Sequence, residues 1–228
     1  MSIRPVNPCT IASILTSVIF TLAACNLTPK DVRIKQMPPL KAAQFAASVD
    51  SSFKAQLPDS NLVLNLWGID SLVISPIAID IDDQGNLYYT TTDRQKNSEF
   101  DIRGHQDWEI PSIALQSIED KRAFLRKYLA PELSAQNTWL KDLNGDGSHD
   151  WRDLTIEKDK VFRLTDTDGD GVADEAQLVV HDFHDEVTDV AGGVLKEGED
   201  LFVSIGPDLW RMRDKNGDGI ADDKVSIS

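Results

Sequence analysis

Three short aspartate-rich segments share one pattern, and that pattern limits the possible folds of this chain more than any other feature. They are residues 142–150 (DLNGDGSHD), 166–174 (DTDGDGVAD) and 214–222 (DKNGDGIAD). Oxygen-bearing side chains stand at positions 1, 3, 5 and 9, and glycine stands at position 6. Alternate oxygens around a sharp turn are what a hard cation such as Ca²⁺ requires. A single Asp-Gly-Asp could be an ordinary polar turn, whereas three copies favour calcium.

The pattern predicts a ligand set for each loop, in which position 7 contributes its backbone carbonyl. The first loop also has an acid at position 12, Asp153, which gives it the fullest predicted set. We interpret all three sites as structural. The predicted ligands are Asp142, Asn144, Asp146, Ser148, Asp150 and Asp153; Asp166, Asp168, Asp170, Val172 and Asp174; and Asp214, Asn216, Asp218, Ile220 and Asp222.

The composition is that of a folded soluble protein, with 41% hydrophobic and 27% charged residues among 228. This length allows one sizeable core or two small ones. The formal net charge of −15 argues against nucleic acid as a partner, because phosphates require a basic surface. Many of the acids lie in the three loops, so bound Ca²⁺ would neutralise part of this charge.

The first 24 residues predict a lipoprotein signal peptide. One cation, Arg4, precedes an apolar run over residues 11–24 that is too short to cross a bilayer. The run ends in Leu-Ala-Ala-Cys25, which resembles a bacterial lipobox, where the signal is removed before a cysteine that then carries lipid. A buried hydrophobic helix is the alternative. The first interpretation predicts a cell-envelope lipoprotein, outer-membrane or periplasm-facing, anchored through Cys25.

Residues 25–55 predict a tether followed by a short helix. Residues 26–39 contain three prolines and little periodicity, and residues 41–54 place apolar side chains on one helical face. Alternating side chains over residues 62–67 then predict a strand.

An internal repeat begins after this segment. Residues 76–92 predict a β-hairpin, and residues 191–204 align with it at an offset of 114. Residues 161–164, together with the loop that follows them, align with residues 209–212 and their loop at an offset of 48. Strand-like segments flank these loops, whereas an EF-hand needs helices, so each ion would close a β-hairpin.

These patterns predict an all-β fold in which residues 56–228 form an incomplete β-propeller of about two four-stranded blades. An insertion of about residues 93–160 interrupts the first blade. It contains one predicted helix, from Pro111 in the first turn to Leu129, which Pro131 ends. We interpret the charged face of this helix as solvated.

Four stretches resemble one known family: residues 75–89 (SPIAIDIDDQGNLYY), 142–154 (DLNGDGSHDWRDL), 161–174 (VFRLTDTDGDGVAD) and 186–195 (EVTDVAGGVL). They look like the large bacterial membrane-bound dehydrogenase or haem-binding proteins, whose N-terminal propeller is similar to sorbosone and soluble glucose dehydrogenases. The resemblance covers about residues 53–228.

The resemblance implies oxidation of sugars or similar alcohols, with electrons passed to a c-type cytochrome domain or protein. It also implies further blades beyond Ser228, and the relatives place their catalytic histidine and quinone contacts in those later blades. No position here therefore inherits a catalytic role, and a quinone cofactor or haem would belong to a longer form. The segment contains no Cys-x-x-Cys-His for covalent haem. The loops also resemble integrin-type propeller repeats, so a non-catalytic adhesion or binding propeller is the alternative function.

Two histidine clusters remain as candidates for chemistry. His184 with Asp185 or Glu186 could form an acid–base pair in a link between blades, because a neighbouring carboxylate tunes an imidazole. A polar surface loop is the simpler interpretation. His105, with Asp107 and Trp108, could face the same cleft or belong to a helix-capping loop, and His149 is predicted to be exposed.

Overall fold

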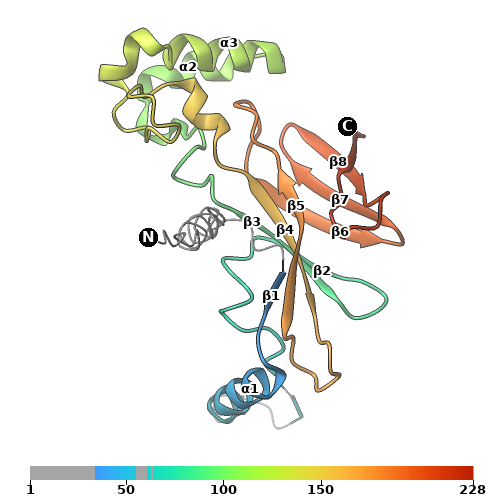
Figure 1. Ribbon diagram of the computed structural model, residues 1–228. Helices are drawn as coiled ribbons and strands as arrows, with labels where there is room; N and C mark the ends of the chain where they lie inside the picture. The colour runs from blue at the N-terminus through green and yellow to red at the C-terminus, as the bar shows by residue number, and fades with distance from the viewer. Residues whose placement is uncertain (1–33, 55–60, 63, 228) are drawn as a thin grey trace, which may run out of the picture. The chain divides into compact units, whose positions relative to one another are not determined.

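The computed structural model describes residues 34–54, 61–62 and 64–227 (Figure 1). The predicted signal peptide, Cys25 and the first part of the tether lie outside the described residues. Most of the repeat region is β-structure, and short helices occupy the insertion. The elements are β1 (Ile34–Gln36), α1 (Pro39–Lys54), β2 (Ile79–Ile81), β3 (Leu87–Thr92), η1 (Ile102–Gly104), η2 (Gln106–Trp108), α2 (Glu109–Ile113), α3 (Ile118–Tyr128), η3 (Pro131–Gln136), η4 (Trp151–Thr155), β4 (Asp159–Thr165), β5 (Glu175–Asp182), β6 (Ala191–Glu197), β7 (Asp200–Ile205), β8 (Asp208–Arg213) and β9 (Asp223–Ser226).

The strands form two antiparallel sheets. The first sheet has five strands in the order β1-β5-β4-β3-β2, and the second has four in the order β6-β7-β8-β9. The two sheets confirm the prediction of a mostly β fold.

The strand register follows the internal repeat. Arg163 pairs with Gln177 in the first sheet, and Arg211 pairs with Val225 at the corresponding place in the second. The offsets of 48 and 114 hold across β3-β4-β5 and β7-β8-β9. The first hairpin is an exception: its turn is one residue longer than the turn between β6 and β7, so the predicted gapless alignment is wrong for β2 and β6.

Each sheet has two faces, which we name by their place in the repeat. The front face of the first sheet includes Tyr89, Phe162 and Leu164, and it packs against Ala42 and Ala46 of α1. Its back face includes buried residues that pack against the front face of the second sheet. That inter-sheet core contains Tyr88, Val161 and Val179 from the first sheet, and Leu201, Val203 and Met212 from the second.

Two predictions before the repeat are wrong. Part of the predicted tether forms β1, which pairs with β5 at the edge of the first sheet. Residues 64–67 form no strand, and instead the Trp67 carbonyl accepts a hydrogen bond from the Ala173 amide at 2.8 Å. In the second repeat the Val179 carbonyl accepts from the Ala221 amide at 2.8 Å. The irregular segment therefore occupies the place that β5 holds for the second sheet.

The insertion contains two helices where the sequence predicts one. Ser117 has an extended backbone, and its hydroxyl accepts from the Asp120 amide at 3.1 Å, so it is the N-cap of α3. This cap separates α2 from α3. The insertion has its own apolar core around Trp108, Phe124 and Leu125. None of the helices in the described part of the chain has the length and apolar character to span a bilayer.

Candidate functional site

The three aspartate loops share one backbone conformation. In each, the aspartate at position 1 accepts hydrogen bonds from the amides at positions 4 and 6, and both positions hold glycine with φ between 73° and 91°. A left-handed conformation at two positions explains why glycine is needed there. The bonds are Asp142 with Gly145 (2.7 Å) and Gly147 (2.9 Å), Asp166 with Gly169 and Gly171 (both 2.8 Å), and Asp214 with Gly217 (2.7 Å) and Gly219 (2.8 Å).

The side chains at positions 3 and 5 also accept the same hydrogen bonds in all three loops. The side chain at position 3 accepts from the amide at position 5, and the side chain at position 5 accepts from the amide at position 7. The first type is Asn144 with Asp146 (2.8 Å), Asp168 with Asp170 (3.2 Å) and Asn216 with Asp218 (2.9 Å). The second type is Asp146 with Ser148 (2.8 Å), Asp170 with Val172 (2.9 Å) and Asp218 with Ile220 (2.9 Å).

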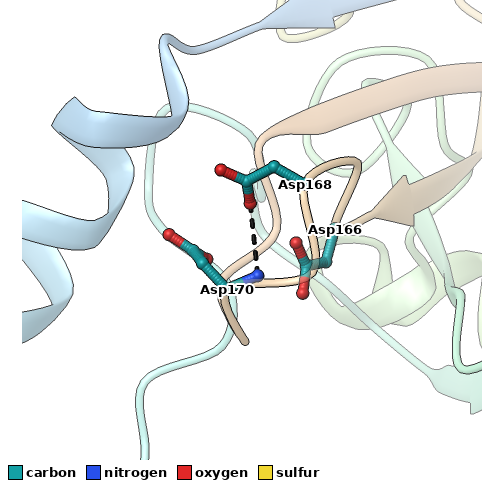
Figure 2. A group of neighbouring side chains, drawn as sticks. All are labelled: Asp166, Asp168 and Asp170. Atoms are coloured by element: carbon teal, nitrogen blue, oxygen red, sulfur yellow. Dashed lines mark hydrogen bonds between the residues drawn. The ribbon is translucent and has the colours of Figure 1, made fainter.

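The second loop, between β4 and β5, gathers the most negative charge. The carboxylate oxygens of Asp166, Asp168 and Asp170 lie within 4.8 Å of one another (Figure 2). Burial opposes the ionisation of Asp166, but the amides of Gly171 and Gly169 outweigh it and lower the pKa. Partial loss of solvent and the charges of Asp170 and Asp166 raise the pKa of Asp168. A divalent cation would remove this repulsion, so the donor set fits Ca²⁺.

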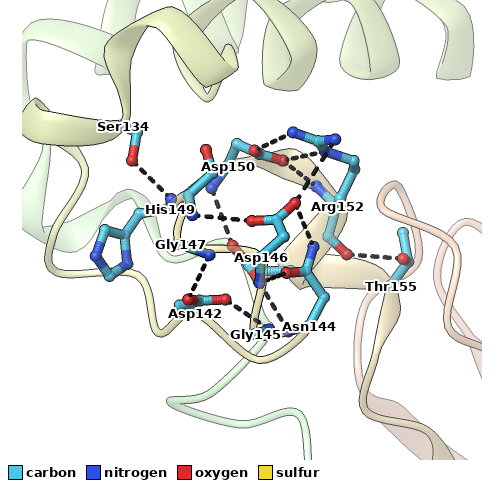
Figure 3. Close-up of polar contacts among 12 residues, drawn as sticks. Ser134, Asp142, Asn144, Gly145, Asp146, Gly147, His149, Asp150, Arg152 and Thr155 are labelled. Carbon is cyan, nitrogen blue, oxygen red and sulfur yellow. Dashed lines mark hydrogen bonds and ion pairs between the residues drawn. The ribbon is translucent and has the colours of Figure 1, made fainter.

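The first loop, in the insertion, has part of its charge already paired. The guanidinium of Arg152 contacts Asp150 at 2.7 Å and Asp146 at 3.6 Å (Figure 3). Hydrogen bonds from Arg152 lower the pKa of Asp150 to about 2. The completely buried Asp153 accepts from the amides of Leu143 (2.8 Å), Asn144 (3.2 Å) and Asp150 (3.0 Å). Because of these bonds, we rank the first loop below the second as a cation site, despite its acid at position 12.

His149, at position 8 of this first loop, is half-buried, so the prediction of an exposed side chain is wrong. Its Nδ1 lies 2.7 Å from the Leu140 carbonyl, which requires that nitrogen to carry the proton. Its amide donates to the Ser134 hydroxyl at 2.8 Å. The histidine therefore attaches the loop to the rest of the insertion.

The third loop, between β8 and β9, has one carboxylate fewer. Asn216 stands where the second loop has Asp168, and its amide group lies 3.4 Å from the Asp222 carboxylate. Gly219 of this loop lies against β5 so closely that an added Cβ would meet the Gln177 side chain at 1.9 Å. Asp214, Asp218 and Asp222 would hold a cation here with less charge than the second loop supplies.

A cavity of about 580 Å³ lies beside the loop that connects β5 to β6. His184 lines it, and His184 Nδ1 lies 3.0 Å from the Thr155 carbonyl. A carbonyl only accepts, so Nδ1 carries a proton in this contact. The other lining residues are Ile118, Arg122, Thr155, Asp182, Phe183, Asp185, Glu186, Val187, Thr188, Pro207, Asp208, Trp210 and Lys224.

The carboxylates next to His184 bind arginines of α3. Arg122 contacts both Asp185 and Glu186 at 2.8 Å, and Arg126 contacts Glu186 at 2.7 Å. Lys121 adds a contact with Asp189 at 2.9 Å. Part of the charged face of α3 therefore contacts this loop, so the prediction of a solvated face is wrong for Lys121, Arg122 and Arg126. Glu119, Asp120 and Lys127 are exposed, as predicted. His184 and its neighbouring acids are brought to one cavity, but the acids are held by the insertion.

Sequence reasoning missed Arg94, which shapes this loop from inside. The side chain is 1% exposed, and its terminal nitrogens donate five hydrogen bonds of 2.6–3.3 Å. Four acceptors are backbone carbonyls and one is a hydroxyl, and all lie in residues 183–189. A lone arginine after a strand carries no local signal for such contacts. The acceptors belong to Phe183, Asp185, Thr188 and Asp189.

His105 does not share the cavity of His184. It stacks on Trp108 with ring centroids 4.1 Å apart, and its ring lies 4.5 Å from Trp139. These rings border a separate cavity of about 370 Å³ that is lined by His105 and Trp139 but not by Asp107. The suggestion that His105 faces the same cleft is therefore wrong.

Comparisons with known proteins give one match. Residues 48–228 match the model of DUF7133, described as a domain of unknown function. No curated protein and no solved structure shows significant similarity to the chain. Since the matched region covers most of its length, the chain belongs to the DUF7133 family.

Proposed function

We propose that this chain is a calcium-stabilised part of a β-propeller in a lipid-anchored protein of the cell envelope. The observation that carries the proposal is the shared geometry of the aspartate loops. Two of them join the last two strands of equivalent four-stranded units, with the same hydrogen bonds at positions 1, 3 and 5. A loop whose backbone amides donate hydrogen bonds to carboxylates, and not to a neighbouring strand, orients those carboxylates to hold an ion.

The ions would act on stability. Asp166, Asp168, Asp170 and the carbonyl of Val172 would hold one ion in the second loop, with Asp174 alongside. Asp174 already accepts from the amide and hydroxyl of Thr167 at 3.0 and 2.7 Å, which fixes its place at the end of the turn. Bound Ca²⁺ would neutralise part of the loop charge and hold β4 and β5 together, so its binding energy would add to the free energy of unfolding.

The packing of the two sheets supports a propeller. The back face of the first unit contacts the front face of the second, so the interface joins unlike faces of equivalent units. Head-to-tail contacts of this kind allow radial repetition. Helix α1 and residues 66–73 pack on the front face of the first unit and would serve as a cap.

For the whole protein we propose oxidation of sugars or similar alcohols, with electrons passed to a c-type cytochrome. The support is the resemblance of four stretches of sequence to dehydrogenase-type propellers. Any quinone cofactor or haem would reside in a longer form. Cell envelopes of the host should lose dye-linked oxidation of these substrates when the gene is deleted and regain it on complementation. Unchanged oxidation in the deletion strain would contradict this role.

A non-catalytic binding or adhesion propeller is the second candidate, and one observation favours it. Asp185 and Glu186, which line the cavity beside the loop that connects β5 to β6, form ion pairs with Arg122 and Arg126, so neither carboxylate is left to act as a base. Retention of oxidation in the deletion strain, together with loss of surface attachment, would select this candidate.

The membrane anchor has a separate test. Cys25→Ala should abolish incorporation of labelled palmitate and release the protein from the membrane fraction. Labelling that survives the substitution would remove the lipoprotein interpretation.

A further inference from the structure

We propose that the back face of the second sheet is a docking surface for a further four-stranded unit of the same repeat. This inference rests on the proposed β-propeller and adds which surface receives the next unit and by which contacts. The docking surface consists of apolar side chains that point away from the inter-sheet core. They are Leu195 on β6, Phe202 on β7, Leu209 on β8, Val225 on β9 and Ile227 after it.

Equivalent positions on the back faces of the two sheets differ in burial. Val161 of the first sheet is 1% exposed, whereas Leu209, 48 residues later, is 38% exposed. Val179 is 7% exposed, whereas its equivalent Ile227 is 49% exposed. The docking surface thus keeps the apolar character of a face that is buried in the first unit. Arg211 lies between Phe202 and Val225 on this face, at the position that Arg163 has on the buried back face of the first sheet. Large exposed faces of mainly apolar side chains mark interfaces, because their exposure costs solubility.

The cover of the first unit indicates which occupant the docking surface would take. Its back face is covered by the front face of the second sheet, through Leu201, Val203 and Met212. The occupant of the docking surface should therefore present a front face of the same kind. A second copy of the whole chain has little of such a face free, because α1 and residues 66–73 pack on the front of its first sheet and the first sheet covers the front of its second. The exposed part is at the β2 edge, where Ile79 and Ile81 are 59% and 60% exposed.

A backbone hydrogen bond recurs between each aspartate loop of the repeat and the segment before it. Ala221, at position 8 of the third loop, donates its amide to the Val179 carbonyl of the preceding unit at 2.8 Å. Ala173, at the same position of the second loop, donates to the Trp67 carbonyl at 2.8 Å. The repeat therefore places the Ile227 carbonyl as the acceptor for the corresponding amide of the docked unit.

The test extends the full chain by a second copy of residues 181–228, which continues the repeat without a gap. We expect the extended protein to melt several degrees higher than the original. Leu209→Asp with Val225→Asp in the original unit should abolish this gain. The same two substitutions in the appended copy should change the melting temperature little, because the back face of that copy stays uncovered. Equal effects in both copies, or no gain on extension, would overturn the proposal.

A second measurement does not depend on the appended copy. The original chain should bind a hydrophobic dye, and Leu209→Asp with Val225→Asp should reduce that binding several-fold. The matched control is Ile79→Asp with Ile81→Asp, since these side chains on β2 are 59% and 60% exposed but lie outside the docking surface. An equal reduction by both pairs would count against a defined surface.

The original chain could instead form a dimer through this surface. If it dimerises, and Leu209→Asp with Val225→Asp makes it monomeric, the surface belongs to a second copy and the proposal is overturned. Loss of the dehydrogenase hypothesis would leave these results unaffected, because melting and dye binding report on packing and not on oxidation.

Discussion

The two sheets share one strand arrangement, but different elements pack against their faces. Their last three strands share register, turn position and the Asp-x-x-Gly-x-Gly loop, so the repeat determines each sheet from within. What covers them differs. The first sheet has α1 and residues 66–73 on its front and the second sheet on its back, whereas the back face of the second sheet exposes several apolar side chains. The difference shows that the repeat specifies a sheet, and that its stability depends on neighbours outside it.

The aspartate loops also share a backbone conformation but differ in their charged residues. The second and third loops have the same hydrogen bonds, yet the second has a third carboxylate, Asp168, where the third has Asn216. The first loop keeps the hydrogen bonds but pairs two of its acids with Arg152. A common turn can therefore hold sets of carboxylates that differ in charge.

The largest expected effect is at the junction of the two sheets. Arg94→Met should destabilise the protein by about 3–5 kcal/mol, because it removes a buried charge and leaves several carbonyls of residues 183–189 without their donor. Arg211→Met, an exposed arginine on β8, should cost less than about 0.5 kcal/mol. Urea unfolding of the two variants checks the difference, and comparable losses would contradict the role given to Arg94.

Equivalent aromatic residues on the two back faces test the difference in cover. Tyr88→Ala should cost about 3–5 kcal/mol, because Tyr88 is buried between the sheets. Phe202→Ala, on the partly exposed face, should cost about 1 kcal/mol. Thermal unfolding of the two variants under identical calcium conditions would compare their losses of stability. Equal losses would mean that the back face of the second sheet is already covered.

Exchanging residues at position 3 tests the difference between the loops. Asp168→Asn should weaken the tightest calcium site about tenfold, because the site loses one charged ligand. The same change should raise the melting temperature of the calcium-free protein, since it removes the repulsion that raises the pKa of Asp168. Asn216→Asp should strengthen calcium binding at the third loop and lower the melting temperature of the calcium-free protein. Calorimetric titration measures the calcium affinity, and melting in EGTA measures the stability without calcium. A calcium affinity that does not change in either variant would exclude these loops as calcium sites.

The smallest effect concerns an ion pair between the sheets, Asp182 on β5 with Lys224 on β9. Burial opposes ionisation of Asp182, but Lys224 and the Phe183 amide together lower the pKa. A lowered pKa in the folded state stabilises above the unfolded value near 3.9, and this contribution disappears as the pH falls through the folded value. The side chains are 32% and 37% exposed, so the contribution should be below about 1 kcal/mol. Lys224→Met should flatten the loss of stability between about pH 5 and pH 3, and an unchanged slope would exclude the pair as its source.

The sequence was sufficient to predict the repeated parts of the molecule. Alternation and the 48-residue spacing predicted β4, β5, β8 and their loops, because strand periodicity and turn chemistry are local. The Ser-x-x-Asp signal at Ser117 was also present and could have revealed the break between α2 and α3.

The remaining features depend on residues that lie far apart in the chain. Alternation over residues 62–67 suggested a strand, but this segment supplies only the Trp67 carbonyl to the neighbouring loop. The arginines of α3 gave no local sign of their partners some 60 residues away. Asp153 fitted a ligand position, and only the structure shows that its oxygens hold backbone amides.

Calorimetric titration of the calcium-depleted chain with Ca²⁺, followed by melting with and without EGTA, tests the central claim most directly. We expect at least one saturable site, a higher melting temperature with Ca²⁺, and loss of the tightest site in the variant Asp166→Asn with Asp170→Asn. Titration heats no different from buffer, together with the same melting temperature in EGTA and in millimolar Ca²⁺, would contradict the account.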